Sequence, residues 1–177
     1  MEQTVSLIEM LDARERRAQR QQALLTQYHT TLVCFTMNIA GPVKISPLIR
    51  RGFARGRELL ERQLTRCRIA VLHQEVYREP TGCEAFYVLD AAPLEVKKLT
   101  TLVEDASPLG RLFDMDVLCP DGRKVDREEL QLEGRRCLIC GGPAKVCSSR
   151  RVHTVAELQA KTTAILTETV SALDAAA

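Results

Sequence analysis

The segment RLFDMDVLC, residues 111–119, alternates between apolar and polar side chains along most of its length. Alternation with a period of two predicts a β-strand that buries one face. Asp114 and Asp116 would then project on the same side, while the apolar residues next to them point into the core. Pro120-Asp121-Gly122 follows directly and predicts a turn into a further extended segment near residues 123–126. The segment therefore offers a pair of carboxylates on one face of a sheet.

Further strands and helices are predicted on both sides of this segment. Strands are expected at residues 31–39, 68–78 and 84–90, the last two joined by a turn through Pro80-Thr81-Gly82. Four helices are expected, namely from Ser6 to about Tyr28, from Pro47 through LIRRGFARGRELLERQL, from Pro93 to about Asp105, and from Thr154 towards the C-terminus. Ser6 with Glu9 and Thr154 with Glu157 have the spacing of capping boxes.

The order and length of these elements predict the fold class. The chain has 177 residues, of which 45% are hydrophobic and 27% charged, which fits one globular domain spanning residues 1–177. Strands and helices intermingle without a linker or a repeat. We therefore expect a mixed α/β (α+β) domain whose central mixed or antiparallel sheet is flanked by helices.

The composition indicates which binding partners are disfavoured and in which cell compartment the protein is expected. The chain has no Trp and few other aromatic residues, so the core is expected to rest on Leu, Val, Ile and Ala, and a stacking platform for single-stranded nucleic acid is disfavoured. The N-terminal segment lacks the pattern of a secretory signal, and no run approaches the ~20 apolar residues of a membrane span. A cytoplasmic protein with seven reduced cysteines is expected.

Arginine greatly outnumbers lysine and is clustered at residues 14–20, 50–57 and 135–140. Its planar guanidinium suits contacts with phosphate or carboxylate groups. The alternative is that these runs are solvated helix faces. In the first helix, one side is expected to carry the apolar residues Leu7, Leu11, Ala18 and Leu25.

The paired aspartates are candidate metal ligands. Two carboxylates held on one face repel each other unless a cation lies between them, and Mg²⁺ prefers such oxygen ligands together with water and substrate phosphates. Gly110 would let a phosphate approach the backbone, and Arg111 could bind it. Asp114, Asp116 and Arg111 are therefore the expected catalytic residues of a phosphoryl or nucleotidyl transfer. The alternative is a pair of solvated acids.

The loop AGPVKIS, residues 40–46, lies between a predicted strand and a capped helix. Lys44 could neutralise a phosphate, and Ser46 with the helix N-terminus adds donors for an anion. Arg50 and Arg51 lie one turn into the helix and are expected near the same place. A structural turn with an exposed lysine remains the alternative, and the loop is not a Walker A motif.

The segment 137–153 contains four residues of types that zinc accepts, namely Cys137, Cys140, Cys147 and His153. A zinc site and a group of buried reduced cysteines both remain open, because the second half lacks a tight pair of ligands. The other cysteines, Cys34, Cys67, Cys83 and Cys119, are interpreted as small core residues, and His29 and His73 as structural.

Three segments, GPVKIS (41–46), PLGRLFDMDVL (108–118) and RRCLICGGPAKVC with the following His (135–153), together resemble the citrate lyase holo-acyl-carrier-protein synthase family. The resemblance runs in order over most of the chain. It implies transfer of phosphoribosyl-dephospho-CoA from 2′-(5″-triphosphoribosyl)-3′-dephospho-CoA to a serine of the citrate lyase acyl carrier (gamma) subunit, with release of diphosphate.

The resemblance also implies roles for individual residues. Asp114 and Asp116 would hold Mg²⁺, while Gly110, Arg111 and Lys44 would contact the triphosphate. The acceptor serine comes from the partner, and the acidity of acyl carriers gives the arginine runs a second role in docking.

Two positions depart from the family pattern. Phe113 stands where a tryptophan is expected, and Ile45 where a polar residue is expected. The motif of two aspartates is also similar to that of the nucleotidyltransferase fold, although the upstream Gly-Ser pair of that fold is missing.

Two alternative functions remain. The same group could be loaded onto another carrier, such as that of malonate decarboxylase. In the other, the cysteine cluster stabilises a non-catalytic module that binds nucleic acid through its arginines.

Overall fold

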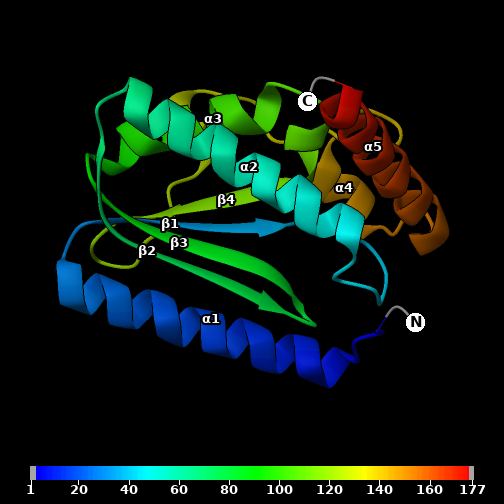
Figure 1. Cartoon of the computed structure of the whole chain (residues 1–177), viewed down its shortest axis with the longest axis horizontal. Coiled ribbons are helices and arrows are strands. Elements are labelled where there is room, and N and C mark those ends of the chain that lie inside the picture. The colour runs from blue at the N-terminus through cyan, green and yellow to red at the C-terminus, as the bar shows by residue number, and fades with distance from the viewer. Residues whose placement is uncertain (1–2, 176–177) are drawn as a thin grey trace.

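The computed structural model describes residues 3–175, so two residues at each end of the expected domain lie outside the described part. A four-stranded antiparallel sheet forms the centre, with helices on both faces (Figure 1). This confirms the predicted fold class. The elements follow one another in this order: α1 (Leu7–Tyr28), β1 (Thr31–Met37), α2 (Pro47–Arg66), β2 (Ala70–Glu79), β3 (Gly82–Asp90), α3 (Pro93–Asp105), the 3-10 helix η1 (Leu109–Leu112), β4 (Phe113–Leu118), the 3-10 helix η2 (Arg127–Leu130), α4 (Ala144–Ser149) and α5 (Val155–Ala175).

The strands are arranged in the order β2-β3-β1-β4, and each neighbouring pair is antiparallel. The turn between β2 and β3 falls where the sequence predicted it, and Gly82 has a φ of 130°, which favours glycine. β4, the strand with the paired aspartates, lies at one edge. The segment after it turns back at Gly122 and forms a bridge between Leu118 and Lys124, as the turn signal predicted.

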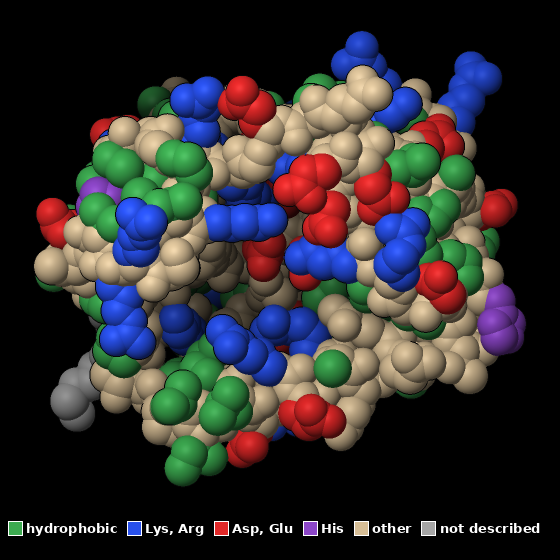
Figure 2. All heavy atoms as spheres, turned by 180° about the vertical axis from the view of Figure 1, so that it is seen from behind, with side chains coloured by type: hydrophobic (Ala, Val, Ile, Leu, Met, Phe, Trp, Pro, Cys, Tyr) green, Lys and Arg blue, Asp and Glu red, His purple; other side chains and the backbone are tan. Residues whose placement is uncertain are grey.

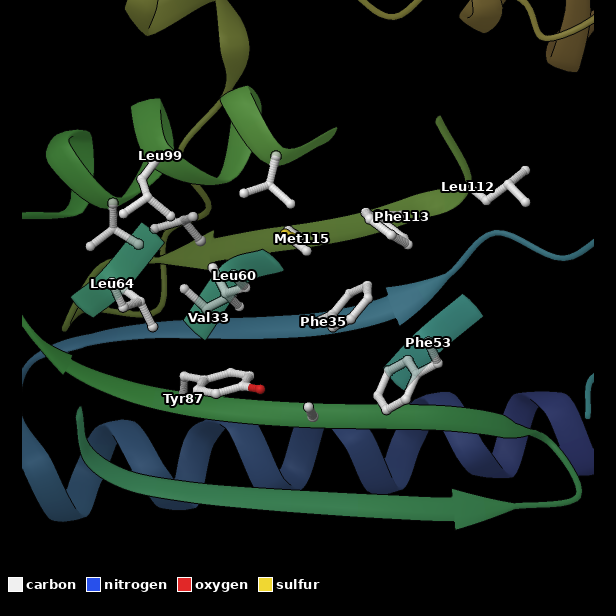
Figure 3. Close-up of a cluster of buried hydrophobic side chains, with 14 of the residues drawn as sticks. Val33, Phe35, Phe53, Leu60, Leu64, Tyr87, Leu99, Leu112, Phe113 and Met115 are labelled. Carbon is white, nitrogen blue, oxygen red and sulfur yellow. The ribbon is translucent and has the colours of Figure 1, made fainter. Parts of the chain in front are cut away.

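The main core lies between the sheet and the helices α2, α3 and α5 (Figures 1 and 3). Phe35 stacks on Phe53 with ring centroids 4.8 Å apart and meets Phe113 edge-on at 5.3 Å. The core rests mainly on Leu, Val, Ile and Ala, as expected, but all four phenylalanines of the chain are buried in it too. A few rings can fill the centre because each buries far more surface than an aliphatic side chain.

Helix α1 covers the opposite face of the sheet through a second, smaller core that includes Leu24 and Leu25. Of the residues predicted for its apolar side, only Leu25 is buried; Leu7 and Leu11 are 74% and 52% exposed, and Ala18 is exposed too. The physical reason is that ion pairs attach the middle of this helix to the sheet, where Arg17 and Arg20 meet carboxylates on β3 and β2.

Two further findings qualify the sequence analysis. Cys34, Cys83 and Cys119 are buried as expected, but Cys67 is exposed, because it caps the C-terminal end of α2. The short helix α4 was not expected. Within residues 3–175, none of the helices has both the length and the apolar composition that crossing a membrane requires.

Gly56 of α2 provides a test of the packing in the main core. A Cβ atom added there would lie 2.5 Å from the ring of Phe35 and 2.8 Å from that of Phe113, both of which are fully buried. We expect Gly56→Ala to lower the free energy of unfolding by about 1–3 kcal/mol through overpacking, despite the better helix propensity of alanine. Urea denaturation would measure it. Gly134→Ala is the control, because nothing lies within 4 Å of its added Cβ; equal losses in the two variants would contradict the packing.

Glu75 provides a test of the attachment of α1. Hydrogen bonding to Arg20 lowers the pKa of Glu75 to about 2 against the effect of burial, and His73 and Tyr77 contribute. A lowered pKa means that the ionised group stabilises the fold above the unfolded-state value near 4.5 and that this contribution is lost as pH falls towards 2.

We therefore expect the stability difference between the wild type and Glu75→Gln to be constant above about pH 5 and to shrink between about pH 4.5 and 2. Urea denaturation at a series of pH values would measure this difference. Glu79→Gln, at the exposed end of the same strand, should show no such dependence. A pH-independent difference for Glu75→Gln would argue against the ion pair.

Candidate active site

Asp114 and Asp116 lie on the face of the sheet that α1 covers. Their neighbours Phe113 and Met115 are buried in the main core, so alternation turns both carboxylates to the other side. In the register of β1 and β4, Asp116 is opposite Cys34, which belongs to the core under α1. The two acids therefore share one face, as the sequence predicted.

The open edge of β4 fixes where these acids lie. Alternate main-chain groups of an edge strand point away from the sheet and need partners. The Met115 N–H donates to the Glu104 carboxylate of α3 at 2.8 Å, and the Arg135 guanidinium donates to the Phe113 carbonyl at 2.7 Å. Arg135 also pairs with Glu104 at 2.5 Å. The backbone is thus held on both sides of Asp114.

Further along the same edge, the returning segment places a cation beside the acids. The Val125 N–H donates to the Val117 carbonyl at 2.9 Å. Lys124, next to it, forms an ion pair with Asp116. Burial alone would lower the pKa of Lys124, but the contact with Asp116 and the charge of Asp114 outweigh it and leave that pKa raised.

A cavity of about 850 Å³ opens over these residues, and its lining includes Lys97, Glu104, Asp114, Asp116, Lys124 and Arg135. This volume is within the range of sites for small molecules and cofactors. Figure 2 shows a hollow in the middle of the face behind the view of Figure 1, with Lys and Arg side chains around it and several acidic ones at its rim. The arrangement combines acidic groups with a surrounding of cations.

Burial dominates the electrostatics of this cavity. Burial raises the pKa of Asp114, and the like charge of Asp116 adds to that effect, while Arg135 and Lys124 oppose it. Burial also lowers the pKa of Lys97, which is 5% exposed and lies on α3. Because the low dielectric strengthens each of these interactions, a cation or a phosphate entering the cavity would interact strongly with its charged side chains.

Asp114 also lines a second, smaller cavity of about 150 Å³, together with Arg14, Arg17 and Lys44. The ammonium group of Lys44 donates to the Ile39 carbonyl at 2.5 Å. Burial lowers its pKa, and the charge of Arg14 adds to the effect. The lysine of the predicted phosphate loop and one aspartate of the predicted metal pair thus meet in one polar cavity.

The other residues of the predicted loop lie in different surroundings. Ser46 caps α2 by accepting the Ile49 N–H at 3.2 Å. Arg50 is exposed, and Arg51 pairs with Asp174 of α5. These two arginines do not line the two cavities that contain Asp114.

Gly110 and Arg111 do not line the two cavities that contain Asp114. Gly110 is buried against the end of α3, where an added Cβ would lie 2.5 Å from the Glu104 carbonyl. Arg111 contacts the carbonyl of Arg136 and lines a third cavity of about 610 Å³. Arg135 and Arg136 line that cavity as well as the largest one.

The cysteine-rich segment forms a compact group. One ligand atom from each of Cys137, Cys140, Cys147 and His153 lies within 4.8 Å of the other three. The Cys140 and Cys147 sulfur atoms are 3.5 Å apart. The fold therefore brings together all four of the candidate zinc ligands.

The sequence indicated Arg135 only as part of an arginine run and did not single out Lys97, Glu104 or Lys124, although all four line the cavity of about 850 Å³. Lys124 had a signal, because the turn at residues 120–122 returns the chain beside β4. Lys97 and Glu104 had none, since they are ordinary polar positions in a helical pattern.

Comparisons with known proteins place the chain in a family. The model of the family described as apo-citrate lyase phosphoribosyl-dephospho-CoA transferase matches residues 5–169. A protein of that name from Citrobacter koseri is 36% identical over 162 residues, which cover 92% of this chain and 88% of the relative. A protein of the same name from Escherichia coli is 34% identical over 164 residues, 93% of this chain and 90% of the relative.

A longer relative, protein CitXG of Haemophilus influenzae, is 36% identical over 154 residues. The match covers 87% of this chain but 33% of that protein. The family match extends over both cavities that contain Asp114 and over the cysteine cluster. By this match and by these relatives, the chain belongs to the family of apo-citrate lyase phosphoribosyl-dephospho-CoA transferases.

Proposed function

We propose that this protein transfers the phosphoribosyl-dephospho-CoA group from 2′-(5″-triphosphoribosyl)-3′-dephospho-CoA to a serine of the citrate lyase acyl carrier subunit, with release of diphosphate. The observation that carries the proposal is the pair Asp114 and Asp116 at a cavity lined by both basic and acidic side chains, in a chain whose relatives have this name. We place the reaction in the nucleotidyltransferase type and in the cytoplasm.

The charges of the site suit a polyphosphate donor. Lys97, Lys124 and Arg135 line the large cavity, and Arg14 with Lys44 lines the small one. In our proposal the small cavity holds terminal phosphates, because about 150 Å³ is too little for the nucleotide. The large cavity is of a size suited to the adenosine and the start of the pantetheine arm. Asp114, which lines both cavities, would then lie close to the phosphate bond that breaks.

Asp114 and Asp116 fit Mg²⁺ as ligands, because they are half-buried carboxylates on the same side of one strand. A bound Mg²⁺ would offset the negative charge that develops on the phosphates during transfer. The side chains of the site have complementary tasks. The arginines and lysines orient the phosphates, and Lys124 balances the charge of Asp116.

The nucleophile is the hydroxyl of the carrier's serine, so no nucleophile of this chain is required. The carrier of malonate decarboxylase remains the alternative acceptor, because the same donor site would serve both. Incubation of each apo-carrier with the donor and Mg²⁺, followed by intact-mass measurement, would identify the acceptor.

Replacement of the aspartates tests the catalytic assignment. We expect Asp114→Asn and Asp116→Asn each to slow transfer by about 100-fold or more, because each removes a negative charge without changing the side-chain volume. The measurement is the mass increase of apo-carrier with time. Asp90→Asn, at the exposed end of β3, is the control and should keep its rate. Full rates in both site variants would rule out the assignment.

Arg14 tests the role of the small cavity. Because it lines this cavity from α1, we expect Arg14→Ala to raise the KM for the donor about tenfold, the effect of losing one hydrogen bond to a charged group. Steady-state kinetics with varied donor would measure it.

Arg16→Ala is the matched control, because Arg16 is exposed two residues away and projects from another side of the helix. An unchanged donor KM in Arg14→Ala would contradict the phosphate role. If the KM for the carrier rose in both variants instead, the run at residues 14–20 would be a docking surface.

A further inference from the structure

The segment 131–153 has almost no hydrophobic core of its own. Cys137 is its only buried residue, and the helix within it, α4, has six residues. A segment that buries so little apolar surface cannot offset the entropy of its own ordering. Nevertheless it forms a wall shared by the cavities of about 850 and 610 Å³, because Arg135, Arg136 and Ala144 line both. Leu138 packs partly buried against the main core and Arg135 pairs with Glu104, but these few contacts leave the rest of the segment in need of another interaction to hold it.

The local backbone brings the cysteines together. The Cys137 N–H donates to the Gly142 carbonyl at 2.5 Å, and the Gly141 N–H donates back to the Cys137 carbonyl at 3.1 Å. Gly141 has a φ of 73°, a conformation that glycine adopts without strain. The Ile139 N–H points at the Cys137 sulfur at 3.5 Å, which favours a thiolate there. This tight turn presents Cys137 and Cys140 on one side.

The spacing of the four ligand atoms fits one tetrahedral ion. Zinc bonds to sulfur at about 2.3 Å, so two sulfur ligands of a tetrahedral ion lie about 3.8 Å apart. The Cys140 and Cys147 sulfur atoms are 3.5 Å apart, and all four ligand atoms lie within 4.8 Å of one another. Three thiolates and one imidazole form a closed, four-ligand set of the type that structural zinc prefers.

His153 provides an independent indication. Its Nε2 atom is buried without a hydrogen-bond partner, one of two such side-chain atoms among the residues that the structure describes. A buried polar atom without a partner costs about 1–3 kcal/mol, and such atoms are rare in native proteins. A metal ion ligated directly by this nitrogen would remove that cost.

We propose that Cys137, Cys140, Cys147 and His153 bind one structural Zn²⁺, which holds the wall between the two cavities against β4. Arg135 connects the zinc-bound loop to β4 directly. The Arg135 carbonyl accepts the Ala144 N–H at 2.9 Å within the zinc-bound loop, and the Arg135 guanidinium contacts Glu104 and the Phe113 carbonyl. Zinc therefore positions Arg135 and, through it, the backbone that precedes Asp114. Zinc binding itself does not depend on the proposed function; only its effect on transfer does.

Metal analysis of the full chain, purified under reducing conditions without added metal, tests the site directly. We expect one zinc per chain. After replacement with Co²⁺, the protein should show the visible bands and the thiolate charge-transfer absorption of a tetrahedral site. A metal-free chain, a chain containing iron instead, or a Cys140–Cys147 disulfide found by mass spectrometry would overturn the proposal.

Variants assign the ligands. Cys140→Ser and Cys147→Ser should each lose bound zinc, whereas Cys67→Ser, which changes an exposed cysteine outside the cluster, should keep it. A strong chelator should lower the Tm of the wild type and of Cys67→Ser by about 5 °C or more and leave the other two unchanged. Full zinc content in the two cluster variants would overturn the assignment even if they were less stable.

The coupling to the carboxylate site needs a readout other than activity. Removal of zinc should increase hydrogen exchange at the amides of residues 134–144 and at the amide of Met115. The Met115 N–H donates to Glu104, which also pairs with Arg135. Unchanged exchange at Met115 would show that zinc does not position the strand. Asp114→Asn should keep its zinc while losing transfer, so failure of the zinc site and failure of the proposed function are distinguishable.

Discussion

The carboxylate of Glu104 joins three parts of the molecule at one point. Its side chain is 3% exposed, and it accepts the Met115 N–H of the edge strand while pairing with Arg127 and Arg135 from the segments that follow. A buried charge is tolerated only when it is paired, and an edge strand is stable only when its outward groups find partners. Both requirements are met by the same contacts. The direction in which Asp114 projects depends on them, because they hold the backbone on either side of it.

The site concentrates opposite charges in a partly dry space. Asp114 and Asp116 are kept on the same face of β4 although they repel each other, and burial together with that repulsion raises the pKa of Asp114. Lys124 offsets part of the negative charge, and Lys97 and Arg135 add further cations. A polyphosphate with its metal brings both signs of charge, so it can bind to the acidic and the basic groups together. This complementarity is the physical basis of our proposed function.

The cysteine cluster gives order to a segment that reaches the main hydrophobic core only through the partly buried Leu138 and the buried Cys137. Both cores lie against the two faces of the sheet, whereas residues 131–153 contain a single buried residue, Cys137. In our proposal zinc takes the place of apolar packing there, as it does in small domains that cannot build a core. The wall of the site would then be fixed at one end by Arg135 and at the other by the metal.

The sequence by itself determined the main strands and helices and the two most distinctive clusters. Alternation in residues 111–119 predicted the strand and the shared face of Asp114 and Asp116, and the capping signals located the helices, because both depend on local periodicity and hydrogen bonding. Only the tertiary structure decided which distant groups meet. Lys44 lines the same small cavity as Asp114, Glu104 approaches Met115 from a helix, and Arg51 pairs with Asp174 instead of joining the site. Such encounters depend on strand order and on the packing of helices over the sheet, and no local pattern encodes them.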